Sequence, residues 1–163
     1  ADTPGVTRDR LYGVVDYKDK SFSLIDTGGI DLENATFNEN IRMQAELAMD
    51  EADVIVFVVD GREDITLNDL AVRDMLMRTN KKVIVALNKI DDKKHEENIY
   101  NYYELGFENI ICISAEHKRN IDKLLDLIRM LYYQDSARNS GIFELYRTYI
   151  PPSASSPHTV KPD

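Results

Sequence analysis

Residues 53–60, with the sequence Asp-Val-Ile-Val-Phe-Val-Val-Asp, form the segment that best indicates the fold. An apolar run of this length is typical of a strand buried on both faces of a parallel sheet. Val83–Leu87 and Asn109–Ser114 predict two further buried strands. Helical patterns separate these strands, and strands that alternate with helices build an open sheet with right-handed crossovers. We therefore expect an α/β fold with an open, mostly parallel sheet.

The other elements follow from local patterns. Two short runs, Leu11–Tyr17 and Ser21–Asp26, predict a hairpin. Helices are predicted over Asn38–Glu51, Thr66–Thr79, Glu96–Leu105 and Asn120–Tyr133, with Thr66 as an N-cap and Gly106 as a C-terminal cap. The last segment, Gln134–Asp163, is richer in proline and serine and is predicted to be a tail, in which only Ile142–Ile150 has the pattern of a strand.

Composition narrows the classes of function. The chain has 163 residues and a formal net charge of −9, which argues against a broad basic surface for nucleic acid. Its single cysteine, Cys112, excludes an internal disulfide. The longest apolar run, Val54–Val59, is too short to cross a bilayer. No signal peptide is recognisable, so we expect a cytoplasmic protein without membrane contact.

Polar motifs follow three of the predicted strands. Asp26-Thr27-Gly28-Gly29 follows the second strand of the hairpin, Asn88-Lys89-Ile90-Asp91 follows the strand Val83–Leu87, and Ser114-Ala115 ends the strand after that. Each motif alone is a weak signal, because polar turns are common at such positions. In open α/β sheets, however, ligands bind outside the carboxyl ends of the strands. The three motifs together therefore predict a nucleotide site at that edge.

The residue types suit the phosphate end of a nucleotide. Asp26 can hold the water shell of Mg²⁺, which prefers oxygen ligands. Gly29 can bring its backbone N–H close to a terminal phosphate, because it has no Cβ. Thr7, in the motif Thr3–Asp9, has a hydroxyl suited to direct Mg²⁺ ligation.

A second group of residues suits the guanine base. The Asp91 carboxylate can accept two N–H bonds from guanine, which adenine does not offer in that arrangement. Asn88 and Lys89 would brace the loop and cover the plane of the base. Ser114 and Ala115 would offer a backbone N–H to the guanine carbonyl.

Longer segments carry a resemblance to a known family. They are Asp2–Tyr12, Leu24–Asp31, Ala48–Glu63, Asn88–Asp91 and Ile113–His117. These segments resemble the first G domain of the EngA-type GTPases in the TrmE–Era–EngA group, over about residues 1–133. The resemblance implies a P-loop NTPase-like, Ras-like G domain that binds and hydrolyses GTP with Mg²⁺ and K⁺. It also implies a parent protein with two G domains and a KH-like domain, which acts in assembly of the large ribosomal subunit through rRNA or ribosomal protein.

On this resemblance, Thr7 takes the switch I role, and Asp26 and Gly29 take the switch II role. The guanine-recognition roles fall to Asn88, Lys89, Asp91, Ser114 and Ala115. Ile30 follows Gly29, where Ras-like GTPases place a glutamine that orients the attacking water. We therefore assign no catalytic residue and expect slow intrinsic turnover.

The chain departs from the family in one respect that affects binding. The motif G-x-x-x-x-G-K-[ST], which cradles the phosphates, does not occur in the 163 residues. The resemblance then implies a partial domain, truncated before switch I, that lacks the P-loop strand and first helix and binds GTP poorly. That strand would lie between Ser21–Asp26 and Asp53–Val59. Ile142–Ile150 is a candidate to fill the position, although its polar Glu144, Arg147 and Thr148 are unusual in a central strand.

Two alternatives stay open. The chain could be a nucleotide-incompetent module with a binding or structural role, or a relative that acts on tRNA modification or is another assembly factor. An upstream strand with a phosphate-binding motif would favour the GTPase. The length of the matching segments favours the EngA type over the other relatives.

Overall fold

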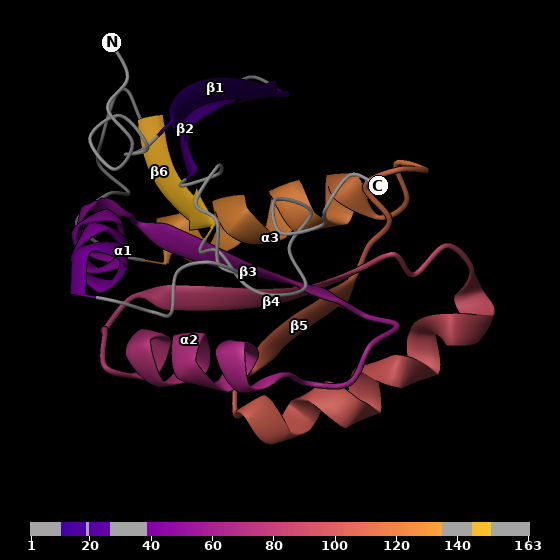
Figure 1. The fold of residues 1–163 in the computed structure, drawn as a ribbon. Helices are drawn as coiled ribbons and strands as arrows, with labels where there is room; N and C mark the ends of the chain where they lie inside the picture. Colours follow the sequence, from indigo (N-terminus) through magenta and orange to yellow (C-terminus); the bar gives the residue numbers. More distant parts are fainter. Residues whose placement is uncertain (1–10, 19, 27–38, 135–144, 151–163) are drawn as a thin grey trace, which may run out of the picture.

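The computed structural model describes residues 11–18, 20–26, 39–134 and 145–150. These residues form a six-stranded sheet with helices on both faces (Figure 1). The strands are β1 (Leu11–Tyr17), β2 (Lys20–Asp26), β3 (Val54–Asp60), β4 (Lys82–Asn88), β5 (Asn109–Cys112) and β6 (Leu145–Ile150). The helices are α1 (Glu39–Glu51), α2 (Leu67–Met77), the 3-10 helix η1 (Lys93–Leu105) and α3 (Ile121–Tyr133).

The strand order is β1-β2-β6-β3-β4-β5. β1 and β2 form the predicted antiparallel hairpin, and every other neighbouring pair is parallel. The expected open, mostly parallel α/β sheet is therefore confirmed. Because β2, β3, β4, β5 and β6 all run in one direction, their carboxyl ends share one edge of the sheet. The predicted motifs that follow β2, β4 and β5 begin at this edge.

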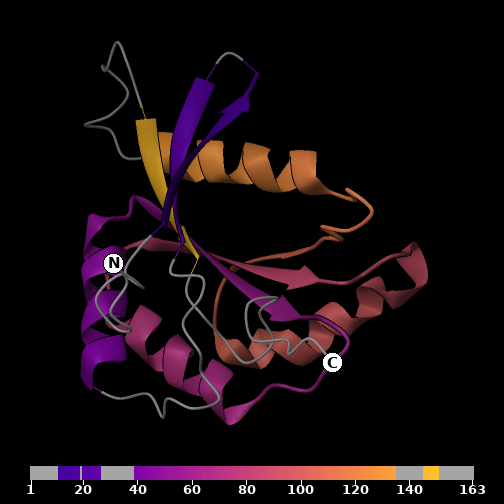
Figure 2. The same cartoon turned by 45° about the horizontal axis from the view of Figure 1, so that its top comes forward.

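The central position between β2 and β3 is occupied by β6. Its six residues pair in parallel with Ser21–Asp26 of β2, while only two of them pair with β3, at Val54 and Ile55. Figure 2 shows β6 lying alongside the hairpin at the point where the sheet turns toward β3. The expectation that Ile142–Ile150 could fill this position is confirmed for Leu145–Ile150. Backbone pairing requires only N–H and C=O groups, so Arg147 and Thr148 do not prevent it.

Two hydrophobic clusters lie on opposite faces of the sheet. Helices α1, α2 and η1 cover one face, where Phe57 and Leu87 are fully buried. Helix α3 covers the other face through Leu124, Ile128 and Leu131. β3 contributes to both clusters, as its continuous apolar run predicted.

Local capping explains where two helices begin. Thr66 caps α2 through a capping box, since its Oγ1 accepts from the Asp69 N–H at 3.0 Å and Asp69 Oδ2 accepts from the Thr66 N–H at 3.1 Å. The helix predicted from Glu96 begins earlier, at Lys93, because Asp92 Oδ1 accepts from the His95 N–H at 3.1 Å. It is a 3-10 helix and ends at Gly106, which has the expected left-handed conformation.

The third apolar strand is shorter and less buried than predicted. β5 ends at Cys112 and lies at the edge of the sheet, so Asn109, Ile110 and Ile111 are only half-buried. Cys112 itself is buried. Burial raises the pKa of its thiol, and the nearby Glu96 carboxylate adds to that effect.

Candidate functional site

The loops that follow β4 and β5 are joined to each other. Asn88, the last residue of β4, is buried, and its side-chain Oδ1 accepts a hydrogen bond from the Ala115 N–H at 2.9 Å. The backbone adds a second link, because the Ile90 N–H donates to the Ile113 carbonyl at 3.0 Å. The motifs Asn88–Asp91 and Ser114-Ala115 therefore meet at the carboxyl edge of the sheet, where open α/β sheets bind their ligands.

Asp91 lies at the surface of this junction. The Ser114 hydroxyl donates to Asp91 Oδ1 at 2.8 Å, and its oxygen accepts from the His117 N–H at 3.2 Å. The Asp91 side chain remains 45% exposed, and its Oδ2 lies 3.9 Å from Nε2 of His117. One carboxylate oxygen is therefore fixed by the protein, while the group as a whole stays accessible to a ligand.

Lys89 is held over the neighbouring strand end. Its backbone is left-handed, with φ of 70°, which is unfavourable for a residue with a side chain. Its Nζ lies 3.1 Å from Oδ2 of Asp60, the last residue of β3. The Asp60 side chain is only 6% exposed. Burial alone would raise the pKa of Asp60, but the Arg62 N–H and the Lys89 ammonium hold this pKa below its usual range.

Gly61 allows the loops after β3 and β4 to approach closely. Its N–H donates to the Asn88 carbonyl at 2.8 Å. A Cβ at this position would lie 2.8 Å from Cδ1 of Ile90 and 3.1 Å from the Asn88 oxygen. Ile90 is fully buried, so it has little room to move away. Packing therefore favours glycine at this position.

The predicted phosphate end of the site falls outside the described residues. Thr7, Gly29 and Ile30 belong to segments that the structure does not describe. Asp26 is placed as the last residue of β2, paired with Leu11 and Ile150, but its side chain is outside the described part. The structure thus brings together Asn88, Lys89, Asp91, Ser114 and Ala115, while the side chains of the predicted Mg²⁺ ligands Thr7 and Asp26 lie outside its described part.

Two residues of this region were not singled out from the sequence. The sequence marks Asp60 only as a strand end, and it does not mark Arg119 at all. Arg119 contacts both the Ile90 carbonyl and the Glu96 carboxylate. The acidic residue directly after an apolar strand was a signal for Asp60, whereas no sequence pattern links Arg119 to its partners.

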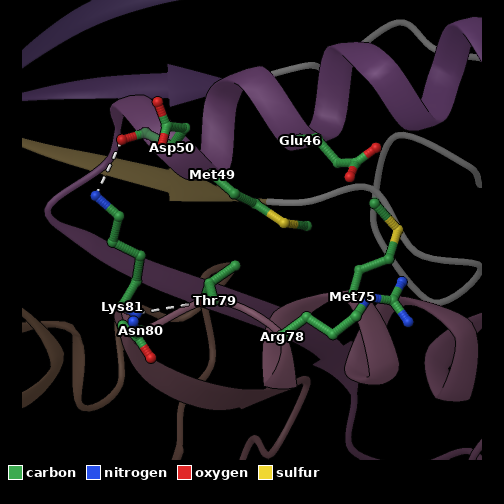
Figure 3. Close-up of a pocket in the computed structure, with 8 residues that line it drawn as sticks. All are labelled: Glu46, Met49, Asp50, Met75, Arg78, Thr79, Asn80 and Lys81. Atoms are coloured by element: carbon green, nitrogen blue, oxygen red, sulfur yellow. Dashed lines mark hydrogen bonds between the residues drawn. The ribbon is translucent and has the colours of Figure 1, made fainter.

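A separate cavity of about 350 Å³ lies between α1 and the loop that joins α2 to β4 (Figure 3). Met49 and Met75 line it, and Glu46, Arg78 and Lys81 project at its sides. The Lys81 ammonium donates to the Asp50 carbonyl at 2.9 Å. Because α2 ends and β4 begins here, this cavity lies at the amino end of the sheet, opposite the joined loops.

Among the residues that the structure describes, no group of three or more His, Cys, Asp or Glu side chains is arranged to hold a metal ion. Within the same residues, no helix combines the length and apolar character that crossing a membrane requires.

The parallel sheet and the joined loops at its carboxyl edge define a Ras-like G domain, the nucleotide-binding domain of GTPases. A crystal structure of an Era variant from Aquifex aeolicus bound to GDP and AlF₄⁻ shares the fold, with a TM-score of 0.61 and 26% sequence identity. The similarity covers 78% of this chain and 45% of the Era chain.

Sequence comparison identifies the family. The chain belongs to the family described as 50S ribosome-binding GTPase, whose model matches residues 1–89. GTPase Der from Listeria welshimeri, a protein of the type also called EngA, is 47% identical over 128 residues, or 78% of this chain. GTPase Der from Mycoplasmopsis pulmonis is 41% identical over 144 residues, or 88% of this chain. The predicted resemblance is confirmed.

The chain spans 29% of the length of the Listeria protein and 33% of the Mycoplasmopsis protein. The similarity therefore concerns only a part of these longer relatives.

Proposed function

We propose that the joined loops after β4 and β5 recognise the guanine base of GTP and GDP. The observation that carries this proposal is the Asp91 carboxylate, fixed by Ser114 at one oxygen and accessible to a ligand. It would accept N1–H and the C2 amine of guanine. Adenine has neither donor in that arrangement, so a bound adenine would leave the carboxylate unpaired.

The other residues of the loops would support the base. The Lys89 stem would cover one face of the ring while its ammonium stays near Asp60. The Ala115 N–H donates to Asn88 in the structure, so the guanine carbonyl would share or replace that bond. Ser114 would act by fixing Asp91.

We further propose that the parent protein hydrolyses GTP as a switch in assembly of the large ribosomal subunit, in the cytoplasm. The family description supports the ribosomal partner. Thr7 and Asp26 would supply the oxygen atoms that Mg²⁺ prefers, and Gly29 would donate its N–H to the terminal phosphate. Because the isoleucine side chain of Ile30 cannot orient water, turnover would be slow, and the resemblance implies that K⁺ would assist it.

The 163-residue chain itself should bind GTP weakly. We propose that residues 1–133 are a partial EngA-type G domain and that 134–163 are a tail that supplies β6. The phosphate-cradling motif does not occur in the chain. The position of β6 between β2 and β3 also favours the second candidate function, a G-domain-like binding or structural module.

Nuclear magnetic resonance titration with GMP and AMP tests the base site without requiring a phosphate cradle. We expect GMP at millimolar concentration to shift the amide signals of Asp91 and Ala115, and AMP to shift them much less. Asp91→Asn should weaken GMP binding about tenfold, the effect of losing hydrogen bonds to a charged group. The neighbouring Asp92→Asn is the matched control, because asparagine also caps helices well. An equal response to GMP and AMP in the unmodified chain would contradict the proposed base recognition.

Titration of fluorescent GDP with Mg²⁺ tests the remaining claim. No saturation in the micromolar range is the expected result. Saturable micromolar binding would contradict the weak-binding proposal and would exclude the nucleotide-incompetent module.

A further inference from the structure

We propose that Arg119 is a positioning residue that fixes the distance between the two guanine-binding loops. This inference rests on the proposed base recognition and adds a residue that makes no contact with the base itself. It follows from three contacts of Arg119, which lie on three different segments of the chain.

The Arg119 backbone closes the loop that carries Ser114 and Ala115. The Arg119 N–H donates to the Ser114 carbonyl at 2.9 Å, and the Ser114 N–H donates to the Arg119 carbonyl at 3.0 Å. This pair of bonds forms an isolated antiparallel bridge between the two residues. Asn120 supports the turn, because its side-chain Nδ2 donates to the Cys112 carbonyl at 2.8 Å.

The Arg119 side chain links this loop to the one after β4. Its Nη1 donates to the Ile90 carbonyl at 3.4 Å, and its Nη2 lies 2.6 Å from Oε2 of Glu96 on η1. The Ile90 carbonyl belongs to the peptide bond that joins Ile90 to Asp91. Arg119 therefore restrains the orientation of the backbone directly before the carboxylate that would accept the guanine N–H groups.

The chemistry of the contact favours arginine at this position. A guanidinium presents several N–H donors in a fixed plane, so one side chain can bind a carbonyl and a carboxylate together. A lysine ammonium is a flexible point charge and would hold one of them at a time. Glu96 is 36% exposed and Arg119 is 24% exposed. A partly exposed ion pair adds little to global stability, so its effect should appear mainly in local geometry.

Three variants test the proposal in the 163-residue chain: Arg119→Ala, Arg119→Lys and the control Arg73→Ala. Arg73 has a side chain 25% exposed and forms an ion pair with Asp74 on α2, away from the loops. Each variant is titrated with GMP and AMP by nuclear magnetic resonance. Amide hydrogen exchange at Ser114 and Ala115 is measured without ligand, and thermal unfolding monitors the fold.

We expect Arg119→Ala to reduce the preference for GMP over AMP about tenfold. This is the effect of losing one hydrogen bond between guanine and the charged Asp91 carboxylate, which would no longer be held in position. Exchange at Ser114 and Ala115 should become faster, with little change in melting temperature. Arg119→Lys should give an intermediate result, and Arg73→Ala should match the unmodified chain.

The outcomes separate the two proposals. If the unmodified chain prefers GMP and Arg119→Ala keeps both that preference and slow exchange, the role of Arg119 is wrong and base recognition stands. If Arg119→Ala unfolds the chain, Arg119→Lys decides: unchanged preference and exchange overturn the role, and a reduced preference supports it. If the unmodified chain does not distinguish GMP from AMP, base recognition is wrong and the role of Arg119 fails with it.

Discussion

Removal of β6 should destabilise the β1–β2 hairpin more than the rest of the sheet. The perturbation is a chain that ends at Gln134, and its matched control ends at Ile150. The two chains differ by the presence of residues 135–150, which include β6. Any effect of residues 151–163 is removed from the comparison, because both chains lack them.

The structure gives the size of the effect. β6 forms six register pairs with β2 and two with β3. At roughly 0.5 kcal/mol for each pair, its loss corresponds to about 4 kcal/mol of stability. For a chain of this size each 1 kcal/mol lowers the melting temperature by about 2–4 °C, so we expect a decrease of about 8–16 °C.

Hydrogen exchange locates the change. In the shorter chain the amides of β2 should lose protection, because a two-stranded hairpin alone is marginally stable in water. Ile25 is fully buried in the cluster beneath α1, so its contacts should be lost at the same time. The amides of β4, which pairs with β3 and β5, should keep their protection. Equal melting temperatures and equal β2 protection in the two chains would refute the central role of β6.

Three further substitutions test contacts in the described part of the chain. Asp60→Asn should reduce stability at pH 7 but have no effect well below pH 3.8, because the pKa of Asp60 is lowered in the folded state and its stabilising contribution is lost as the pH falls through this folded-state pKa. Urea unfolding at the two pH values measures the effect, and an equal loss of stability at both would contradict it. Gly61→Ala should cost about 1–3 kcal/mol through crowding against Ile90, as measured by chemical denaturation, and a neutral result would show that the loops can move apart. Thr66→Ala should cost about 1 kcal/mol by removing the α2 cap, while Thr66→Ser should preserve stability; equal losses in the two variants would exclude capping as the cause.

Much of the fold could be predicted because its signals are local. The apolar run of β3 indicates burial on both faces, and Phe57 and Val56 do lie in opposite hydrophobic clusters. The Thr66 cap is likewise encoded within three residues of sequence. The early start of η1 was missed because its cap, Asp92, directly follows the predicted ligand-binding motif Asn88–Asp91, where a loop was expected to continue.

The residues of the candidate site could be predicted from their positions near strand ends, but the contacts that hold them in place could not. Asn88 ends β4, Asp91 and Ser114 lie a few residues beyond the ends of β4 and β5, and parallel strands bring their carboxyl ends to one edge. The contacts that hold these residues join distant parts of the chain. Arg119 reaches Glu96, 23 residues earlier, and the sequence between them gives no sign of that pairing.

The position of β6 shows that a segment can become an interior strand without the continuous apolar run that is typical of one. Its polar residues argued against a central position, yet the neighbouring strands favour one: β3 carries fully buried Val54 and Ile55, and their backbone groups need partners on both sides. β4 pairs with β3 on one side, and β6 is the only described strand that pairs with it on the other side. An unpaired apolar edge would favour aggregation, so even a moderately suitable segment gains by pairing there. The unpaired backbone groups at the facing edges of β2 and β3, more than the amino-acid sequence of residues 145–150, therefore account for the strand order.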